Sequence, residues 1–408
     1  MSALPLDCMQ TESAESDIYG LSGKLKRKMA WIRKAEGVSP HNRSKVLGFE
    51  RHCRASGIGV ARTLRYMHDL PLFAEMLRKD VEKATRGDVE KVLQTLENSE
   101  YSPRTKLDFK ASVKRFYKWL NGGEEYPECV RWIKTGAKLN NEKIPDALLT
   151  EEDVKKMIGK CHNTRDRALL STLWESGCRV SELLTSSVGH VAIEETITRI
   201  TVHGKTGMRR VPLLDSTPYL VEWLDDHPTK EEPASPLWVG VGNPGRGKRL
   251  EYGAARKMLR EIARRAEVRK DVNPHNFRHS RATHLAKHLT EAQMNQYFGW
   301  VRGSDMPATY VHLSGRDIDE SILKMRGLLK PKEETVESSL APIPCPRCKL
   351  VNKATGRFCT RCGAVLDIST AVTMQDKVKE LDEKFSRLLR DDKVQEFLVR
   401  RLVELGIT

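Results

Sequence analysis

The sequence has no long apolar run, and no stretch approaches the roughly 20 residues that a membrane-spanning helix needs. Its first twenty residues carry acidic residues and serines, where a secretory signal has a basic segment followed by an apolar one. The nine cysteines are an odd number, which does not suit a fully paired extracellular disulfide scaffold. These absences argue against a secreted or membrane protein and lead us to expect a reducing compartment.

The sequence also has fewer acidic residues than basic ones. The 408 residues include 70 Lys and Arg against 55 Asp and Glu, which gives a formal net charge of +15. Hydrophobic residues make up 39% of the chain, enough to build real cores in two or three domains. A basic protein without a membrane segment often binds a polyanion, and nucleic acid is the leading candidate.

The N-terminal part of the chain divides into a polar segment and a helical domain. Residues 1–40 are predicted to be a basic, polar segment, and apolar residues recur at helical spacing over residues 41–134. The clearest helix follows Ser102, a good N-cap, and Pro103, which suits the first helical position. We expect residues 41–134 to form a helical domain.

The same helix carries a stripe of lysines, each four residues apart: Lys106, Lys110, Lys114 and Lys118. Like charges at this spacing destabilise an isolated helix by about 0.2–0.5 kcal/mol per pair. A phosphate backbone along that face would reverse the effect, and an ordinary solvated lysine face would explain the stripe equally well. Both interpretations stay open, and the four lysines are candidate DNA-binding residues.

Composition also sets the next boundaries: a linker at residues 135–148, a domain at residues 149–330 and a second linker at residues 331–341. The domain opens with a capping-box pattern at Thr150 and Asp153. β-Branched residues before a Gly-Lys-Thr-Gly turn, and a short strand after it that ends at Leu213, predict a β-hairpin. The rest of the domain is predicted to be helical.

Six polar or aromatic residues of this domain stand in an informative order: Arg179, Lys205, His275, Arg278, Trp300 and Tyr310. Each alone has an ordinary explanation, such as a salt bridge at a helix corner for Arg179 or a satisfied core histidine for His275. The set is specific, because a motif carries weight when each member stands in its expected local context. Arg179 stands at a helix-to-helix corner, and Lys205 stands on the hairpin turn.

This order resembles the tyrosine recombinase (phage integrase) family, which uses Arg, Lys, His-x-x-Arg, His or Trp, and a nucleophilic Tyr in that sequence. The resemblance runs from about Ser44 to Leu328, because the preceding helices are similar to the family's core-binding domain. The C-terminal tail, which contains two Cys-x-x-Cys pairs, is similar to that of archaeal members. The resemblance implies a mainly α fold with a small β-hairpin or sheet, in which a core-binding domain and an integrase-type catalytic domain form a two-domain DNA clamp.

The resemblance also implies an activity, site-specific DNA recombination. Tyr310 would attack the scissile phosphate, form a 3′-phosphotyrosine and release a 5′-hydroxyl, without ATP or a catalytic metal. Arg179 and Arg278 carry over as the groups that stabilise the phosphoryl transition state, because guanidinium binds two oxygens at once. Lys205 carries over as the general acid, and His275 as the acid/base partner of the tyrosine.

Two details depart from the family pattern. Trp300 stands where many members have histidine, and its single indole N–H fits hydrogen bonding and packing. The loop between Trp300 and Tyr310 is one residue longer than expected, which leaves open whether Tyr310 serves its own active site or a neighbour's.

Two alternative functions stay in view. A type IB-like topoisomerase uses similar residues to relax supercoils, and strand exchange between two marked sites distinguishes a recombinase from it. A non-enzymatic DNA-binding architectural protein on the same scaffold would not form a covalent adduct. The complete set of six residues disfavours the architectural alternative.

Residues 342–366 contain two Cys-x-x-Cys pairs, formed by Cys345, Cys348, Cys359 and Cys362. Four thiolates at this spacing are typical of a zinc ribbon with a structural Zn²⁺. A segment this short cannot fold on its apolar residues alone, which supports a bound metal. Its charged residues are basic, so both DNA and protein stay open as its partner.

Residues 371–408 are predicted to be helical. Val378, Leu381, Phe385 and Leu388 recur at spacings of three and four, which suits a helical hairpin or a short coiled coil. Packing against the same chain and self-association both stay open. The predicted partners are double-stranded DNA and further copies of this chain assembled on it as a dimer or tetramer, with no membrane. The predicted location is the cytoplasm, in association with the nucleoid.

Overall fold

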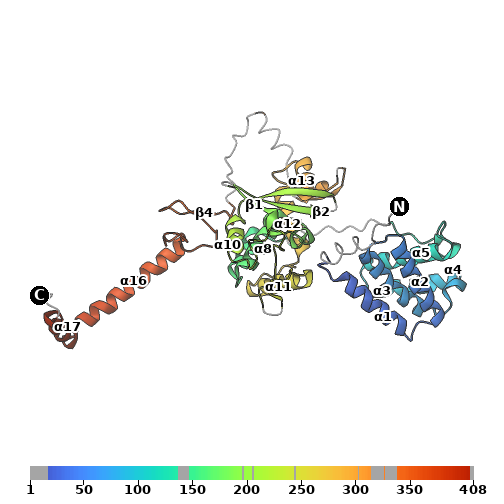
Figure 1. Ribbon diagram of the computed structural model, residues 1–408, viewed down its shortest axis with the longest axis horizontal. Coiled ribbons are helices and arrows are strands. Elements are labelled where there is room, and N and C mark those ends of the chain that lie inside the picture. The colour runs from blue at the N-terminus through green and yellow to red at the C-terminus, as the bar shows by residue number, and fades with distance from the viewer. Residues whose placement is uncertain are drawn as a thin grey trace, which may run out of the picture. The chain divides into compact units, whose positions relative to one another are not determined.

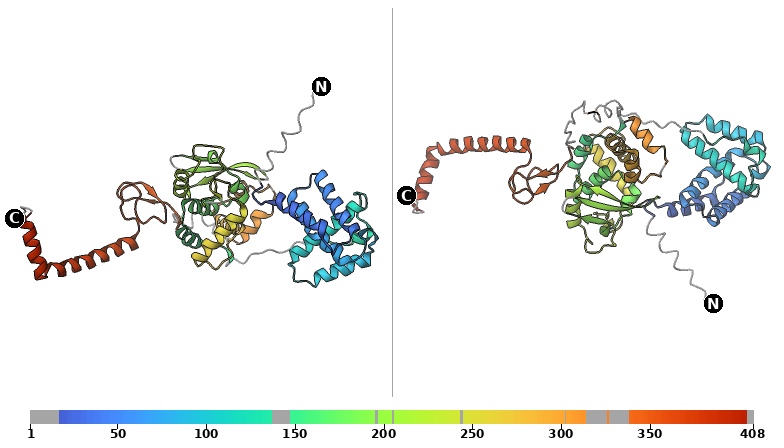
Figure 2. Two further views of the ribbon diagram at one scale, coloured as in Figure 1. Left: turned by 60° about the horizontal axis from the view of Figure 1, so that its bottom comes forward. Right: turned by 90° about the horizontal axis from the view of Figure 1, so that it is seen from above.

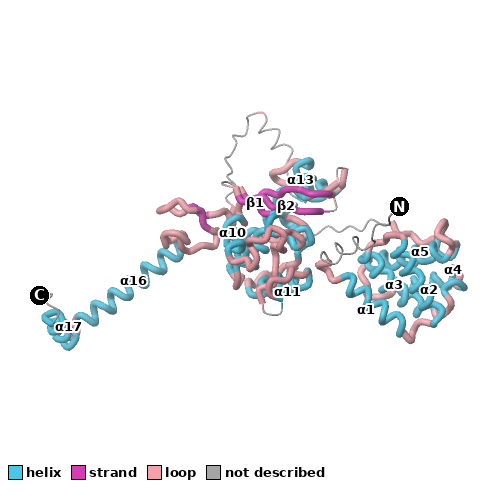
Figure 3. Tube along the Cα trace, in the orientation of Figure 1, coloured by secondary structure: helices cyan, strands magenta, loops and turns pink. Residues whose placement is uncertain are grey.

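The computed structural model describes residues 17–136, 147–194, 197–204, 206–242, 245–301, 303–313, 326 and 338–404. The chain separates into two compact units, residues 1–143 and 144–408. In the described part, helices dominate both units and all strands lie in the second unit (Figures 1 and 3). None of the described helices is long and apolar enough to cross a membrane. The predicted mainly α fold with a small sheet is confirmed.

The described helices of the first unit are α1 (Leu21–Lys34), α2 (Pro40–Ala55), α3 (Val60–Leu77), α4 (Arg86–Glu97), α5 (Pro103–Leu120) and α6 (Glu128–Arg131). Their starts are set by local capping. The Ser102 side chain accepts a hydrogen bond from the Thr105 N–H, and Pro103 is the first residue of α5. Thr85 and Asp88 form a capping box at the start of α4. The predicted start of α5 is confirmed.

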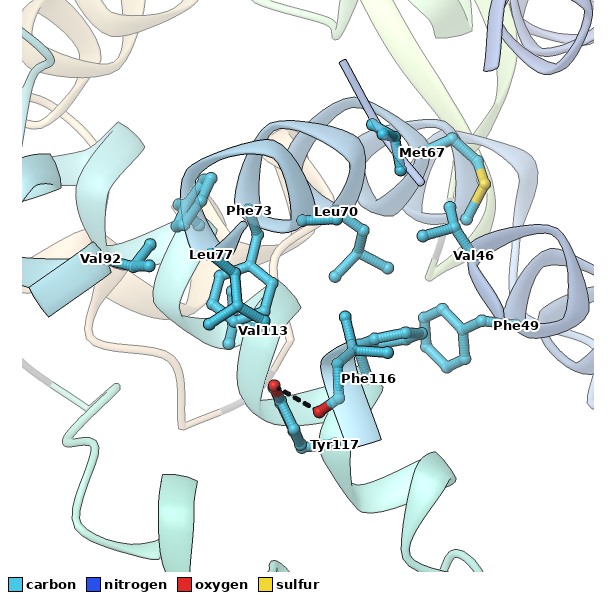
Figure 4. Packing of buried hydrophobic residues seen from close by; sticks show 14 of the residues in the cluster. Val46, Phe49, Met67, Leu70, Phe73, Leu77, Val92, Val113, Phe116 and Tyr117 are labelled. Atoms are coloured by element: carbon cyan, nitrogen blue, oxygen red, sulfur yellow. Dashed lines mark hydrogen bonds between the residues drawn. The ribbon is translucent and has the colours of Figure 1, made fainter. Parts of the chain in front are cut away.

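One apolar core joins these helices (Figure 4). Phe49 of α2 and Phe116 of α5 meet edge to face, with ring centroids 5.4 Å apart. Tyr117 is also buried, and its hydroxyl donates a hydrogen bond of 3.0 Å to the carbonyl of Val81. A fully buried side chain of this size contributes about 1.5–3 kcal/mol, so the apolar face of α5 anchors the unit.

The helical unit starts earlier than predicted. Residues 1–40 are expected to be a polar segment, yet α1 buries Leu25, Met29 and Ile32 in the core of the unit. These residues stand four and three apart among lysines and arginines. The polar composition of the segment therefore conceals an amphipathic helix. The helical domain begins with α1 and not at residue 41.

In the second unit, the described helices before the tail are α7 (Glu151–Gly159), α8 (Thr164–Ser176), α9 (Val180–Leu184), α10 (Thr217–Asp225), α11 (Tyr252–Arg265), α12 (Pro274–Leu285), α13 (Glu291–Phe298) and α14 (Met306–Leu313). Helix α8 is central, because α7, α10 and α12 all pack on it. Its residues are buried almost all round, which suits a helix enclosed by others. The predicted capping box at Thr150 and Asp153 opens α7.

A three-stranded antiparallel sheet lies beside these helices, with strands β1 (Val191–Ile193), β2 (Thr198–Gly204) and β3 (Gly207–Leu213) in that order. Alternate residues point inward, so Ile200 and Val202 of β2 are buried, as is Val211, which pairs with Ile200. The predicted hairpin is β2 and β3. The sequence did not indicate β1, which has three residues and pairs only along β2 among the described strands.

The prediction that the remainder of this domain is helical is wrong between α10 and α11. The described residues there form irregular chain with isolated bridges, such as Val239 to Arg249. A Cβ on Gly240 would lie 2.2 Å from the carbonyl oxygen of Gly245, so this close turn requires glycine. Glycines and prolines divide the segment into turns that a helix cannot contain.

The C-terminal part contains β4 (Ile343–Pro344), β5 (Val351–Asn352), α16 (Ile368–Leu389) and α17 (Asp392–Glu404). Lys353, which follows β5, forms an ion pair of 2.5 Å with Glu222 of α10. The hydroxyls of Thr355 and Tyr219 lie 3.0 Å apart. These contacts join the ribbon segment to α10. Figure 2 shows α16 as one long helix with the shorter α17 at an angle to it, so the predicted helical tail is confirmed.

Candidate active site

Arg278 is held rigidly inside the second unit. It lies on α12, whose N-cap Asn273 accepts hydrogen bonds from the N–H groups of His275 and Asn276. The guanidinium donates to the carbonyls of Gly177 at 2.9 Å and Phe298 at 2.7 Å. Burial and the nearby charge of Arg179 lower the pKa of Arg278 to about 10. The side chain therefore stays charged at neutral pH, in an orientation fixed by two carbonyls.

Arg179 lies at the corner between α8 and α9. Gly177 ends α8 in the left-handed conformation, with φ of 54°, and a Cβ there would lie 2.5 Å from the Phe298 ring. Two residues later Arg179 is the N-cap of α9, and its Nη1 donates to Glu182 Oε1 at 2.9 Å. The tight corner and this ion pair set the direction of the Arg179 side chain.

Glu182 is a site residue that the sequence prediction missed. It is 2% exposed and also accepts a hydrogen bond of 2.7 Å from Arg209 of β3. Burial would raise the pKa of Glu182, but the hydrogen bonds from Arg209 and Arg179 outweigh burial and lower it. Arg209 also donates to the Tyr297 carbonyl at 3.0 Å. The Glu182 carboxylate thus links the Arg179 corner to the hairpin.

Tyr310 lies on α14 and is buried against two aromatic rings. Its hydroxyl is 2.5 Å from Nδ1 of His279, and its ring stacks on Trp300 with an interplanar angle of 1° and centroids 5.4 Å apart. Burial raises the pKa of Tyr310 to about 12, and the charge of Arg278 acts in the opposite direction. The hydroxyl is therefore protonated at neutral pH. His279 is a second residue that the prediction did not include in the site.

The predicted residues His275, Arg278 and Trp300 also lie near Tyr310 and His279. The rings of His275 and His279 have centroids 4.3 Å apart, and the guanidinium carbon of Arg278 lies 5.5 Å from the centroid of the Trp300 ring. Lys205 lies outside the described residues. Its neighbour Thr206 donates to the Gly299 carbonyl at 3.2 Å, which places the end of the hairpin beside the α13 terminus.

The lysine stripe of α5 is engaged within its own unit. The ammonium of Lys110 pairs with Glu97 at 2.5 Å, and Lys106 donates to the Glu97 carbonyl at 2.6 Å. Lys114 donates to the Ile133 carbonyl, and Lys118 lies over the Tyr126 ring. A freely solvated face does not describe these side chains. Their contact with DNA stays a prediction.

The four cysteines of the ribbon come together. All four Sγ atoms lie within 4.8 Å of one another. Cys345 and Cys362 have their sulfurs 3.5 Å apart, as do Cys348 and Cys359. A tetrahedral metal with Zn–S bonds of about 2.3 Å places its sulfurs about 3.8 Å apart, so this set of donors fits zinc.

Known proteins resemble the chain in sequence and in fold. Residues 147–316 match the phage integrase family. The chain is 27% identical over 270 residues to a tyrosine recombinase of Thermosipho africanus, across 64% of this chain and 91% of that protein. It is 26% identical over 245 residues to tyrosine recombinase XerA of Pyrococcus horikoshii, across 59% and 81%. In fold it resembles XerH bound to its difH substrate, with a TM-score of 0.53 at 18% identity, covering 77% of this chain and 98% of that one.

Proposed function

We propose that the chain is a tyrosine recombinase, which cleaves and rejoins double-stranded DNA at specific sites through a covalent bond to Tyr310. The observation that carries this assignment is the position of Tyr310, buried on Trp300 and hydrogen-bonded to His279, next to the fixed guanidinium of Arg278. Because all of these groups belong to one chain, we propose that Tyr310 acts in its own active site.

The proposed cleavage step balances without an external energy source. The Tyr310 oxygen attacks the scissile phosphorus, so that a bond from phosphorus to tyrosine forms as the bond to the 5′-oxygen breaks. The phenolic proton passes to a histidine, and the 5′-oxygen receives a proton, for which Lys205 is the proposed donor. Rejoining is the reverse, with a 5′-hydroxyl attacking the phosphotyrosine. The intermediate keeps the phosphodiester energy, so the reaction needs no nucleotide cofactor.

Two arginines are proposed to bind the non-bridging oxygens of the phosphate. Arg278 is oriented by two carbonyls and Arg179 by Glu182. Groups fixed in this way need no reorganisation when negative charge develops in the transition state. Guanidinium suits the task, because it remains charged and donates two parallel hydrogen bonds.

Two histidines stand close enough to handle the tyrosine proton. His275 carries over from the family as the acid/base partner, and His279 contacts the hydroxyl directly at 2.5 Å. We propose that His279 orients the hydroxyl and that His275 acts as the acid/base group once DNA is bound. The T-shaped contact of the two rings, with planes at 83°, couples the position of one to the other.

The ribbon is proposed to hold one structural Zn²⁺ through Cys345, Cys348, Cys359 and Cys362. The sulfur spacing and the N–H of Cys348, which donates to the Cys345 sulfur at 3.4 Å, support this assignment. The bound metal would give a short segment the rigidity that its few apolar residues cannot supply. DNA contact by the α5 lysines and a location at the nucleoid are further parts of the proposal.

The test is covalent trapping on nicked suicide duplexes from a library of native flanking DNA or random sequence. Cleavage beside the nick releases a short DNA fragment that carries the 5′-hydroxyl. Because this fragment diffuses away, the adduct cannot be rejoined, and it accumulates and is seen on a denaturing gel. We expect an adduct with the natural chain and none with Tyr310→Phe, which removes one oxygen and keeps the ring on Trp300. Arg278→Ala should also abolish it, because it removes a transition-state contact.

The outcome separates the alternatives. An adduct that depends on Tyr310 excludes an architectural protein. Exchange of strands between two differently labelled copies of the trapped site then identifies a recombinase, and relaxation of supercoils without exchange identifies a topoisomerase. Adduct formation that persists in Tyr310→Phe would overturn the assignment of the nucleophile.

A further inference from the structure

Helix α16 presents an apolar stripe that no described part of the chain covers. Val378 is 54% exposed, Leu381 64%, Phe385 63% and Leu388 53%. A row of large apolar side chains along one helix face marks an interaction surface. The stripe is therefore available to a partner, and self-association is one of the two arrangements that the sequence left open.

The stripe follows a heptad repeat. Val378 and Phe385 take the a positions, and Leu381 and Leu388 take the d positions. In the first of these heptads, β-branched Val378 at a with Leu381 at d favours a two-stranded coiled coil. The pattern therefore fits one partner helix of the same kind, with the a and d side chains of each helix packing into the other.

The charges that flank the stripe fix the direction of the partner. In this register Lys377 and Lys384 are at g, and Asp382 is at e. In a parallel pair of identical helices, a g residue faces the e residue five positions later on the partner. Lys377 of each copy then faces Asp382 of the other. In an antiparallel pair the g positions face one another, which would bring the lysines together.

We infer that α16 is a dimerisation helix, which forms a parallel two-stranded coiled coil with α16 of a second copy of this chain. Two symmetric ion pairs between Lys377 and Asp382 set its direction. The other lysine at g, Lys384, is paired within its own helix with Glu380 at 2.6 Å. This interface is separate from the active site, and it does not need DNA in order to form.

The length of the stripe sets the strength of the association. The four stripe residues belong to two heptads and bury a limited area, so the free chain should dimerise weakly, at micromolar concentrations or above. Binding of two copies to adjacent DNA sites makes the second contact intramolecular and raises the effective concentration to about the millimolar range. The same helix then contributes strongly to assembly on DNA.

Charge reversal tests the inference on the full chain without DNA. Analytical ultracentrifugation of the natural chain should show a monomer–dimer equilibrium. Lys377→Glu should weaken dimerisation about tenfold, because it replaces two attractive pairs with two repulsive ones. Asp382→Lys should do the same. A mixture of the two variants should form heterodimers at natural strength, since each pair then joins opposite charges.

Lys379→Glu is the matched control, because it makes the same charge change at a b position of the same helix. A natural chain that stays monomeric at 100 μM, on the order of the weak limit expected for such an area, would overturn the inference. Equal effects of Lys377→Glu and Lys379→Glu would overturn it too. Stronger dimerisation of Lys377→Glu would show an antiparallel pair instead.

The test is independent of the proposed catalytic function. Tyr310→Phe should sediment as the natural chain does, and Lys377→Glu should still form the covalent adduct with a suicide duplex that carries a single half-site. Loss of the adduct with normal dimerisation would contradict the proposed function alone. Loss of dimerisation with a normal adduct would contradict the coiled coil alone.

Discussion

The Tyr310 hydroxyl lies 2.5 Å from Nδ1 of His279, the residue that follows Arg278 in the chain. The contact joins the proposed nucleophile on α14 to α12, the helix that carries Arg278, the proposed transition-state arginine. Because Arg278 is itself fixed by two carbonyls, the hydroxyl is positioned relative to a rigid group. His279 is thus a positioning residue for the tyrosine.

This relationship predicts the effect of removing the imidazole. In His279→Ala the hydroxyl loses its orienting partner, and we expect suicide-substrate cleavage to slow about 10²-fold, the loss that a misplacement of about 1 Å can cause. His279→Asn should recover a large part of the rate, because the amide can place a polar atom near the position of Nδ1. The measurement is the single-turnover rate of adduct formation at saturating protein, with DNA binding followed in parallel.

A structural defect would give a different result. If His279→Ala only disturbed folding, then binding and thermal stability would fall together and Asn would not rescue the rate selectively. Equal rates for the natural chain and His279→Ala would show that the contact with Tyr310 does not matter for cleavage.

Glu182 should be essential for both stability and cleavage. Glu182→Gln leaves the buried Arg209 without its carboxylate and frees Arg179 from its orienting partner. Breaking a buried ion pair on one side costs about 3–5 kcal/mol, so denaturant unfolding should show a loss of that order. Adduct formation should also drop at temperatures where the variant is folded.

Glu261→Gln provides the matched control, because Glu261 forms an ion pair of 2.7 Å with Arg264 on the exposed surface of α11. Exposed pairs contribute about 0–1 kcal/mol, so this substitution should leave stability and cleavage nearly unchanged. Similar losses in the two variants would contradict the role assigned to Glu182.

Much of the fold can be predicted from the sequence. The parts that cannot be predicted depend on contacts between residues that lie far apart in the chain. Ser102, Thr85 and Thr150 act within three residues of their targets, so the starts of α5, α4 and α7 can be predicted from local capping. The Glu182–Arg209 pair joins residues 27 positions apart, and no local pattern specifies that contact.

The same distinction applies to α1 and to the segment before α11. Leu25, Met29 and Ile32 have helical spacing, but the lysines and arginines between them make the segment polar as a whole and conceal the pattern. The chain around Gly240 is shaped by its approach to Gly245 and by bridges to distant residues. Tertiary contacts of this kind override local propensity.

A half-buried carboxyl near the β3–α10 turn predicts a pH-dependent stability. Burial, together with the charge of Glu175, raises the pKa of Asp215 to about 6. A raised folded pKa favours the protonated form, so this contribution to stability is present below about pH 4 and is lost as the pH rises to about 6. Ionised Asp215 therefore destabilises the fold at neutral pH.

Asp215→Asn should remove this cost. We expect the variant to be more stable than the natural chain by about 1–2 kcal/mol at pH 7 and about equally stable at pH 4. The Asn oxygen can still accept the hydrogen bond that Ser338 donates to Asp215 at 3.2 Å. Urea unfolding at the two pH values measures the difference. A variant less stable at pH 7 would contradict the destabilising role of the charge.

Metal removal should affect the ribbon far more than the catalytic helices. We expect one zinc per chain by elemental analysis, lost in Cys345→Ser and kept in Cys129→Ser, because Cys129 lies in the first unit, outside the four-sulfur cluster. The ribbon contacts α10 through the Lys353–Glu222 pair and the Thr355–Tyr219 contact, which are polar interactions. Such contacts contribute about 1 kcal/mol each, so the chelated chain should become sensitive to protease at residues 342–366 while the remainder of the second unit keeps its melting temperature within a few degrees. Zinc that remains bound in Cys345→Ser at full stoichiometry would contradict the four-thiolate site.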